Sequence, residues 1–460
     1  MAQAQTLDIA GLIDSRRVDA FNWSVIILSF FIILFDGYDI SAIAFAGPLV
    51  ARAWGVSNIG LFMGTVFGAS LVGMLFGAPL IGYFGDRFGR KTATIVSSLF
   101  FGVLTLACCW ATSLEQLRIL RFFVGLGIGG MMPNLIALNA EFAQRRYRAS
   151  MVIIMFCGVT LGGAVPGWIA ISIVPHFGWQ ALFAVGGVLP IIMAIVAYFW
   201  LPESLKYLVV QGKRAAAARL VQRLAPGTPV SADTQFIIAD EGRQSRSLSP
   251  HHLFKGGLAF ITPLLWLCFA TNLAGFYFMV SWTPTILKAN NVLSPDAAAL
   301  ATTLIQIGGT VGGLLLARPM DSKGFLPVTV LFAVAVPSIA AIGYFATISQ
   351  TGVLVAAFCS GFAVLGLQFG LNAASAMIYP THIRSNGSGW AFGIGRFGSI
   401  LGPIPGGYLV ARHLPLWQLF LIWTIPSIVG LLAALALTLL YRVRFKGLGL
   451  GQREALEGGV

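Results

Sequence analysis

Charged side chains are scarce in this chain: they make up 10% of its 460 residues, whereas a soluble domain carries about 25%. Hydrophobic residues make up 57%, and the mean hydropathy is +0.85. This composition excludes an ordinary soluble domain. The apolar residues form twelve runs long enough to cross a bilayer as helices: 22–50, 57–83, 92–112, 116–141, 149–173, 178–201, 259–287, 296–318, 326–348, 352–378, 386–411 and 417–441. The sequence therefore predicts an all-α polytopic membrane protein.

Cysteine is also rare, and the motifs of enzymes are missing. The five cysteines all lie inside apolar runs, with the spacing of neither a metal site nor a disulfide framework. No phosphate-binding glycine loop precedes a Lys-Ser or Lys-Thr pair, which argues against ATP-driven transport. No hydrolytic triad or cluster of metal ligands stands out. We expect no catalytic site, cofactor or metal.

The positive charges are unevenly distributed between the connections. The formal net charge is +13, and most cations lie in alternate connections between the apolar runs. The opposite connections hold little beyond Arg52, Arg118, Lys288 and Arg412. Because cytoplasmic loops of membrane proteins are enriched in Lys and Arg, the pattern predicts that both termini are cytoplasmic. A nucleic-acid partner is not expected, since no single soluble module gathers the charge.

The longest hydrophilic stretch divides the apolar runs into six and six. It spans residues 202–258, and its basic residues at 213–223 predict a short amphipathic helix on the membrane surface. The predicted organisation is an N-terminal cytoplasmic segment (1–21), a six-helix bundle (22–201), a cytoplasmic linker (202–258), a second six-helix bundle (259–441) and a cytoplasmic tail (442–460).

The two halves repeat one another. Gly77 lies nine residues before Asp86, and Gly312 lies nine residues before Asp321; a cation and a glycine follow each aspartate. Paired bundles of this kind expose a site between them to each side of the membrane in turn. The repeat predicts two pseudo-symmetric bundles and alternating access.

Two aspartates lie within the first apolar run. Asp36 and Asp39 are three residues apart, and this spacing places them on one face of a helix. A carboxylate at such a depth costs about 2.5–3.5 kcal/mol to insert, so it is seldom kept without a partner or a function. We expect the pair to bind and release protons as a coupled unit, with Asp39 the first candidate for the carrier and Asp36 the next. A helix-packing role is the alternative.

Several motifs resemble those of a known family. The loop Gly82-x-x-x-Asp86-Arg87-x-Gly89-Arg90-Lys91 resembles the signature of the major facilitator superfamily. Within that superfamily, the aromatic acid:proton symporters are similar in Asp36-Gly-Tyr-Asp39, Arg121-x-x-x-Gly125-x-Gly127, Ala140-Glu141-Phe142, Asn272 and Tyr379-Pro-Thr-x-x-Arg384. The resemblance implies a proton-coupled importer of a small aromatic carboxylate, in the bacterial inner membrane and functional as a monomer.

The resemblance also implies roles for charged residues. It implicates Arg121 in proton coupling, although from the sequence Arg121 can equally pair with Asp36 or Asp39 or meet an anionic substrate. The expected proton-coupling residues are Asp36, Asp39, Arg121 and Glu141, with packing or gating an equal alternative for Glu141. The signature loop is a cytoplasmic latch in the family, and a second latch joins Glu141 to arginines of its own half. The expected gating residues are Asp86, Arg87, Arg90, Arg148, Asp321 and Arg384.

A second cation lies deep in an apolar run. Arg396 is about ten residues into the eleventh run, and segments seven to twelve hold no acid at membrane depth. Its guanidinium is therefore the freer of the two buried cations and suits a substrate carboxylate, which it can bind in a fork. The alternatives are that Arg396 pairs with a protein acid or only faces the cytoplasmic half of the cavity. Polar and aromatic side chains of the same half complete the predicted substrate-binding set: Arg396, Asn272, Tyr277, Gln306, Asn372 and Trp390.

Other functions remain open at this stage. The same fold serves exporters and antiporters, and Gly402-Pro403-x-x-Gly-Gly resembles an antiporter motif, although that motif belongs in the fifth run and here lies in the eleventh. A carrier of another small organic anion is a further alternative. A sensor that binds its ligand without transport is disfavoured, because such proteins often carry a long cytoplasmic extension and only nineteen residues follow Tyr441.

Overall fold

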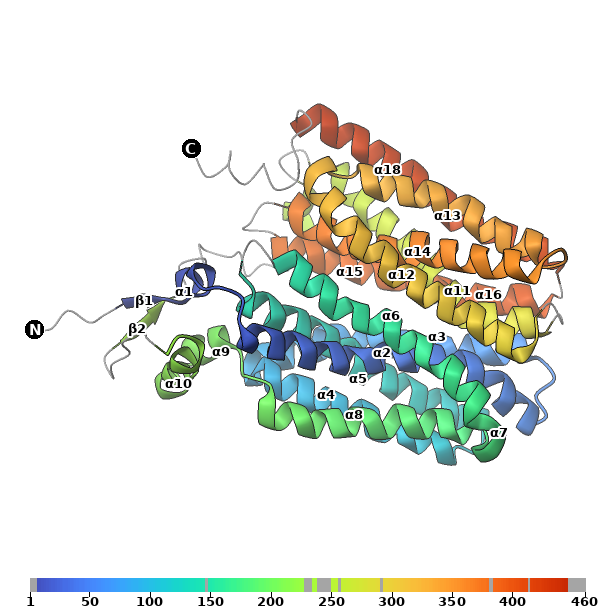
Figure 1. The fold of residues 1–460 in the computed structure, drawn as a ribbon, viewed down its shortest axis with the longest axis horizontal. Coiled ribbons are helices and arrows are strands. Elements are labelled where there is room, and N and C mark those ends of the chain that lie inside the picture. Colours follow the sequence, from blue (N-terminus) through green and yellow to red (C-terminus); the bar gives the residue numbers. More distant parts are fainter. Residues whose placement is uncertain are drawn as a thin grey trace, which may run out of the picture.

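The structure is a computed structural model that describes residues 6–144, 148–226, 234–237, 250–254, 258–289, 293–379, 384–412 and 414–445. Its long helices run roughly parallel in two groups, shown in the lower and upper halves of Figure 1. Side-chain caps begin several helices: Asp19 accepts hydrogen bonds from two backbone amides at the start of the first long helix, and Ser113 and Ser349 each accept one.

The first group is built from residues 20–200. Its long helices are α2 (Ala20–Ala53), α3 (Ile59–Phe88), α4 (Arg90–Ala107), α5 (Leu114–Phe142), α6 (Arg148–Ser172) and α8 (Gln180–Trp200). Two short turns, η1 (Cys108–Trp110) and α7 (Val174–Phe177), connect them.

The second group begins after a short turn, η3 (Pro250–Phe254). Its helices are α11 (Ile261–Ala289), α12 (Pro295–Lys323), α13 (Leu326–Phe345), α14 (Gln350–Ile378), α15 (Arg384–Leu401), α16 (Pro403–Ala411), α17 (Leu416–Ile422) and α18 (Thr424–Phe445).

The helices match the predicted membrane segments. Within the described residues, eleven helices are long and apolar enough to cross a membrane. The remaining predicted segment, 386–411, is present as α15 and α16, which meet at Gly402. The helical hydrogen bonding is interrupted there because Pro403 has no amide hydrogen to donate to the preceding turn. The prediction of an all-helical polytopic protein is confirmed.

The internal repeat is visible in how the helices pack. Helix α3 lies so close to α5 that a side chain at Gly77 would overlap the backbone of Leu126. Helix α12 approaches α14 in the same way, and a side chain at Gly312 would overlap the backbone of Phe362. The glycines that begin the two repeated sequences therefore perform the same packing function in both groups.

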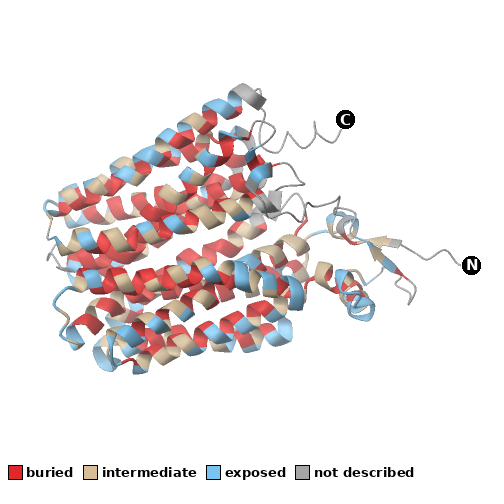
Figure 2. Cartoon of the chain, turned by 180° about the vertical axis from the view of Figure 1, so that it is seen from behind, coloured by how far each residue is buried: buried red, intermediate tan, exposed pale blue. Residues whose placement is uncertain are grey.

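Four helices form the outer walls of the two groups. Helices α4 and α8 pack against each other in the first, and α13 and α18 do so in the second. In Figure 2, exposed residues lie along the outer helices, and buried residues lie where helices face one another. The exposed apolar side chains of α8 and α18 include Leu189, Ile192, Phe199, Ile425 and Leu432. A continuous apolar exterior of this kind suits lipid.

Short elements gather at one end of the molecule, called here the proximal end (left in Figure 1). They are α1 (Ile9–Ser15), α9 (Leu205–Val210), α10 (Arg214–Leu224) and the strands β1 (Thr6–Asp8) and β2 (Gln235–Ile237), which pair in parallel. Helix α10 is the predicted amphipathic helix: Ala217, Val221 and Leu224 are buried, while its arginines are exposed. The pairing of β1 with β2 was not predicted.

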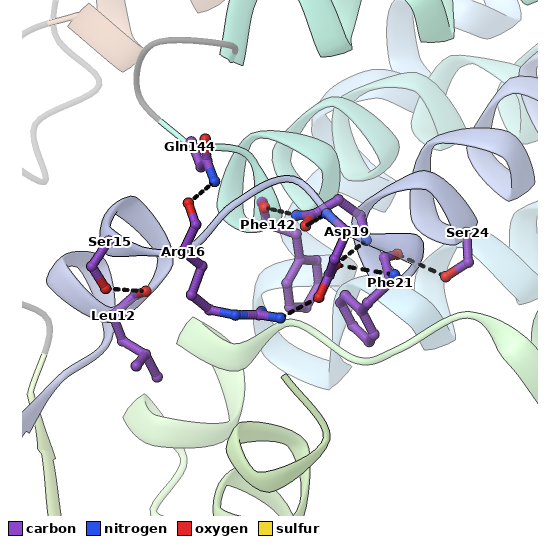
Figure 3. Close-up of polar contacts among 9 residues, drawn as sticks. Leu12, Ser15, Arg16, Asp19, Phe21, Ser24, Phe142 and Gln144 are labelled. Atoms are coloured by element: carbon purple, nitrogen blue, oxygen red, sulfur yellow. Dashed lines mark hydrogen bonds and ion pairs between the residues drawn. The ribbon is translucent and has the colours of Figure 1, made fainter. Parts of the chain in front are cut away.

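The N-terminal segment is fastened to the proximal end of α5. Figure 3 shows Gln144 donating its amide to the backbone carbonyl of Arg16, whose guanidinium contacts Asp19. Asn22 donates to the carbonyl of Phe142 at 2.6 Å. These bonds fix the start of α2 relative to the end of α5.

The two groups meet closely toward the opposite, distal end. A side chain at Gly60 of α3 would lie 2.6 Å from the carbonyl oxygen of Gly407 in α16. The hydroxyl of Thr285 in α11 donates to the carbonyl of Ala44 in α2 at 3.2 Å. The two groups therefore contact each other in the distal half, where glycine allows α3 and α16 to approach closely.

Candidate functional site

The four residues of the Asp-Gly-Tyr-Asp sequence in α2 face different neighbours. A side chain at Gly37 would overlap the carbonyl group of Val159, so only glycine lets α2 and α6 approach this closely. The hydroxyl of Tyr38 donates to the carbonyl of Leu182 in α8 at 2.9 Å. Successive helical residues are about 100° apart, and the two aspartates are left to face other helices.

Asp39 faces α5, where it binds Arg121. The two Nη atoms of Arg121 donate to the two carboxylate oxygens of Asp39 at 2.7 Å each, and each side chain is 2% exposed. Ser70 of α3 accepts a further bond from Arg121 at 3.2 Å. The sequence left open whether Arg121 pairs with Asp36, Asp39 or a ligand; in this structure it pairs with Asp39, inside the first group.

Asp36 has a different environment. It is fully buried, and neither carboxylate oxygen has a hydrogen-bond partner among the described residues. Arg396, in the second group, and Asp39 are charged groups whose fields act on it. A buried carboxylate without hydrogen bonds is tolerated in its neutral form, because the ionised form requires partners. The two aspartates of one helix face are thus held in unlike settings.

Arg396 lies where the two groups of helices meet. Its Nη1 donates to the hydroxyl of Tyr277 at 3.2 Å, and its Nη atoms lie 3.9 and 3.8 Å from the sulfurs of Met74 and Met132. Thioether sulfur is only a weak acceptor, so Tyr277 is the stronger of these partners. In the described part of the chain, no acid lies within ion-pair distance of this guanidinium.

Two predicted substrate residues are joined by a third polar side chain. Asn272 of α11 donates to Gln368 of α14 at 3.0 Å, and Gln368 donates to Asn372 at 2.9 Å. Asn272 is buried, whereas Gln368 and Asn372 are partly exposed. The amides form a chain between two helices of the second group.

Two other predicted substrate residues have protein partners here. Gln306 of α12 donates to the hydroxyl of Ser41 in α2 at 3.2 Å and so bridges the two groups. Trp390 stacks on Trp266 of α11, with ring centroids 5.9 Å apart. Ser41 was not predicted, because a lone serine in an apolar helix gives no sequence signal.

Charged residues of the first group interact at the proximal end. Arg90 forms an ion pair with Glu141, and Ser204 donates to the same carboxylate at 2.6 Å. Asp86 is 74% exposed and lies 3.8 Å from Arg90. Sequence reasoning missed Ser204, although a serine directly before a helix is a recognised capping signal.

The other predicted gating residues are Arg87, Arg148, Asp321 and Arg384. The side chain of Arg87 is exposed, with its guanidinium 5.7 Å from the ring centroid of Phe88. The side chains of Arg148, Asp321 and Arg384 lie outside the part of the chain that is described.

A separate cavity of about 810 Å³ lies at the distal end. Both groups line it, with Phe45, Arg52 and Ile171 on one side and Lys288 and Asp296 on the other. None of the residues that contact Arg396 borders this cavity, so it is distinct from the site around Arg396. Elsewhere too, within the described residues, no three His, Cys, Asp or Glu side chains are placed to hold a metal ion.

Comparison with known proteins identifies the family. A sequence model of the Major Facilitator Superfamily matches residues 29–372. The chain belongs to this superfamily. It is a multi-pass membrane transporter, not an enzyme. The fold is that of the superfamily: the xylose transporter XylE of Escherichia coli, in a partially occluded inward open conformation, has a TM-score of 0.68 at 18% identity, covering 93% of this chain and 99% of that one.

Sequence relatives within the superfamily include aromatic acid transporters. The 4-hydroxybenzoate transporter of Acinetobacter baylyi is 35% identical over 445 residues, which cover 95% of this chain and 94% of that one. The gallate transporter of Pseudomonas putida is 34% identical over 435 residues, which cover 94% and 95%. The family predicted from the sequence motifs is confirmed.

Proposed function

We propose that this transporter imports a small aromatic carboxylate together with protons, by alternating access across the bacterial cytoplasmic membrane. The main support is Arg396. Its guanidinium is permanently charged, lies between the two groups of helices, and has no acid of the described residues within ion-pair distance. A fork-shaped cation among apolar side chains suits a flat monoanion, because it binds a carboxylate through two parallel hydrogen bonds.

The relatives support the same ligand class. Two relatives are named for gallate and 4-hydroxybenzoate, each of which combines an aromatic ring with one carboxylate and at least one ring hydroxyl. The amide chain of Asn272, Gln368 and Asn372 offers donors and acceptors for such hydroxyls. We assign the carboxylate to Arg396 and the ring substituents to this chain.

Protons are assigned to the carboxyl groups of α2. Asp36 is fully buried without a hydrogen-bond partner, which is the setting of a group that changes protonation rather than one that stabilises the fold. The excess of cations in the connections of the proximal end supports a cytoplasmic location for that end and for both termini. We further propose that one chain suffices for transport.

Uptake into proteoliposomes tests the proposal. Purified protein is reconstituted, and accumulation of radiolabelled 4-hydroxybenzoate is followed with an acidic exterior, then with the pH gradient collapsed by nigericin. Unlabelled benzoate and gallate should compete, whereas hexanoate, an aliphatic acid of similar size, should not. Accumulation that does not respond to the gradient would contradict proton coupling, and equal competition by hexanoate would contradict the aromatic class.

A further inference from the structure

We propose that Asp36 and the substrate carboxylate pair with Arg396 in turn, so that a substrate anion can bind only when Asp36 carries a proton. This inference rests on the proposed function and adds the way in which proton and substrate are coupled. It also assigns the exchanging proton to Asp36 rather than to Asp39.

The first step is that Arg396 reaches across the boundary between the groups. It belongs to α15, yet its Nη atoms contact the sulfurs of Met74 in α3 and Met132 in α5. Asp36, in α2 of that same group, is fully buried with both carboxylate oxygens unbonded, and the positive charge of Arg396 acts on it. A cation of the second group can therefore balance the charge of a carboxylate of the first group. The distance between the two depends on the relative position of the two groups of helices.

The second step is that the other charged groups near Asp36 are already paired or neutral. Asp39 is held by both Nη atoms of Arg121 at 2.7 Å. The hydroxyl of Tyr277 already accepts a bond from Arg396 at 3.2 Å and carries no charge at neutral pH. Of the described groups that act on Asp36, Arg396 is thus the cation left to balance its negative charge.

The third step is a balance of charge. When no substrate is bound, Asp36 gives up its proton and Arg396 supplies the balancing positive charge. In the loaded transporter, the ligand carboxylate takes Arg396 and Asp36 is protonated. An ionised Asp36 beside a bound anion would place two negative charges on one guanidinium in a buried site, which is strongly unfavourable.

This balance fixes the stoichiometry. One proton enters on Asp36 with each monoanion on Arg396, and the net charge of the site is the same in its empty and loaded forms. Transport should therefore be electroneutral, driven by a pH gradient and unaffected by membrane potential.

Ligand affinity measured against pH tests the inference directly. Binding of 4-hydroxybenzoate to the detergent-solubilised protein is followed by calorimetry between about pH 6 and about pH 8, where the ligand stays ionised. Because Asp36 must take up a proton before the ligand binds, the affinity of the wild-type protein for 4-hydroxybenzoate should fall by up to about tenfold for each unit of increase in pH. Asp36→Asn should bind as tightly as the wild type at low pH, with no such slope.

Transport assays separate coupling from binding. Asp36→Asn should still catalyse counterflow of 4-hydroxybenzoate but should not accumulate it in response to a pH gradient. A pH slope retained by Asp36→Asn would overturn the inference. Wild-type uptake driven by a potassium diffusion potential in the presence of valinomycin would overturn electroneutrality and, with it, the charge balance.

A measurement on the unmodified protein makes the test independent of how the variant folds. When benzoate is added to the wild-type protein in weak buffer near pH 7.5, a pH indicator should report uptake of up to one proton per ligand bound. Binding without proton uptake across the pH range would overturn the inference, while leaving import of aromatic acids intact. Failure of the wild-type protein to bind or exchange any aromatic acid would instead refute the proposed function.

Discussion

Asp39 and Arg121 form a two-pronged ion pair in which each Nη atom donates to a different carboxylate oxygen at 2.7 Å. Each side chain is only 2% exposed, so water could not solvate either charge if its partner were removed. A buried pair of this kind is costly to break from one side, because the remaining charge is left uncompensated. The pair connects α2 to α5 within one group and is expected to support the fold of that group.

Neutralising one member of the pair should destabilise the protein more than neutralising both. Asp39→Asn and Arg121→Gln should each lower the free energy of unfolding by about 3–5 kcal/mol. The double variant should recover much of this loss, since no charge stays unpaired. Melting temperatures in detergent, read from intrinsic fluorescence, give the comparison.

A matched control lies on the same helix. Glu115 contacts Arg118 at 2.6 Å, but its side chain is 73% exposed. Glu115→Gln should therefore cost less than about 1 kcal/mol. A double variant of Asp39 and Arg121 that melts lower than either single variant would show that the pair does more than balance charge.

The residues of this site could be found from the sequence, but not their pairing. Asp36 and Asp39 stand out as acids in an apolar run, and Arg121 and Arg396 as cations at depth. Which aspartate Arg121 binds depends on the rotation of α2 relative to α5, and a spacing of three residues leaves that undetermined. The sequence put Asp39 first as proton carrier; its bonds to Arg121 are the reason we now propose Asp36.

The same limit applies to contacts between distant elements. Long apolar runs predicted the helices, and the repeated glycines predicted two related groups. The bond from Gln306 to Ser41 joins residues 265 positions apart, and the three-residue strands β1 and β2 are too short to give a pattern. Met74 and Met132 beside Arg396 are ordinary apolar residues in sequence. Tertiary packing decides all of these.

The proximal cluster should depend more on Glu141 than on Asp86. Glu141 pairs with Arg90 and accepts from Ser204, so Glu141→Gln should cost about 1.5–3 kcal/mol of stability. Asp86 is largely exposed, and Asp86→Asn should change stability by less than about 1 kcal/mol. Melting temperatures of the two variants, measured side by side, give the order; equal losses would contradict it.

The role of Asp86 should appear in conformation rather than in stability. As part of the predicted latch, Asp86→Asn should lower the rate of 4-hydroxybenzoate counterflow more than the affinity for the ligand. Both quantities can be measured on the same preparation. A loss of affinity as large as the loss of rate would argue against a gating role.

Distal closure should depend on the absence of a side chain at Gly60. Gly60→Val would press a branched side chain against the carbonyl of Gly407 and hold the two groups apart at that end. Spin labels at the positions of the exposed Arg52 and Lys288, in a cysteine-free background, should then lie farther apart. Pulsed electron paramagnetic resonance measures the distance between the two labels. Gly389 has open space around its Cα, so Gly389→Ala serves as the control. An unchanged distance distribution in Gly60→Val would show that this contact does not close the distal end.

Substrate affinity should follow the geometry of the cation at position 396 and not only its charge. Arg396→Lys keeps the charge but loses the two-pronged fork, so benzoate should bind about tenfold more weakly, and Arg396→Ala should lose about a hundredfold or more. Tyr277→Phe removes only the hydroxyl that orients the guanidinium and should cost about fivefold. Arg412→Lys, at an exposed cation just after α16, should leave affinity unchanged. Calorimetry on the four variants tests the order. Wild-type affinity in Arg396→Ala would move the carboxylate to Arg121, where a ligand must first displace Asp39.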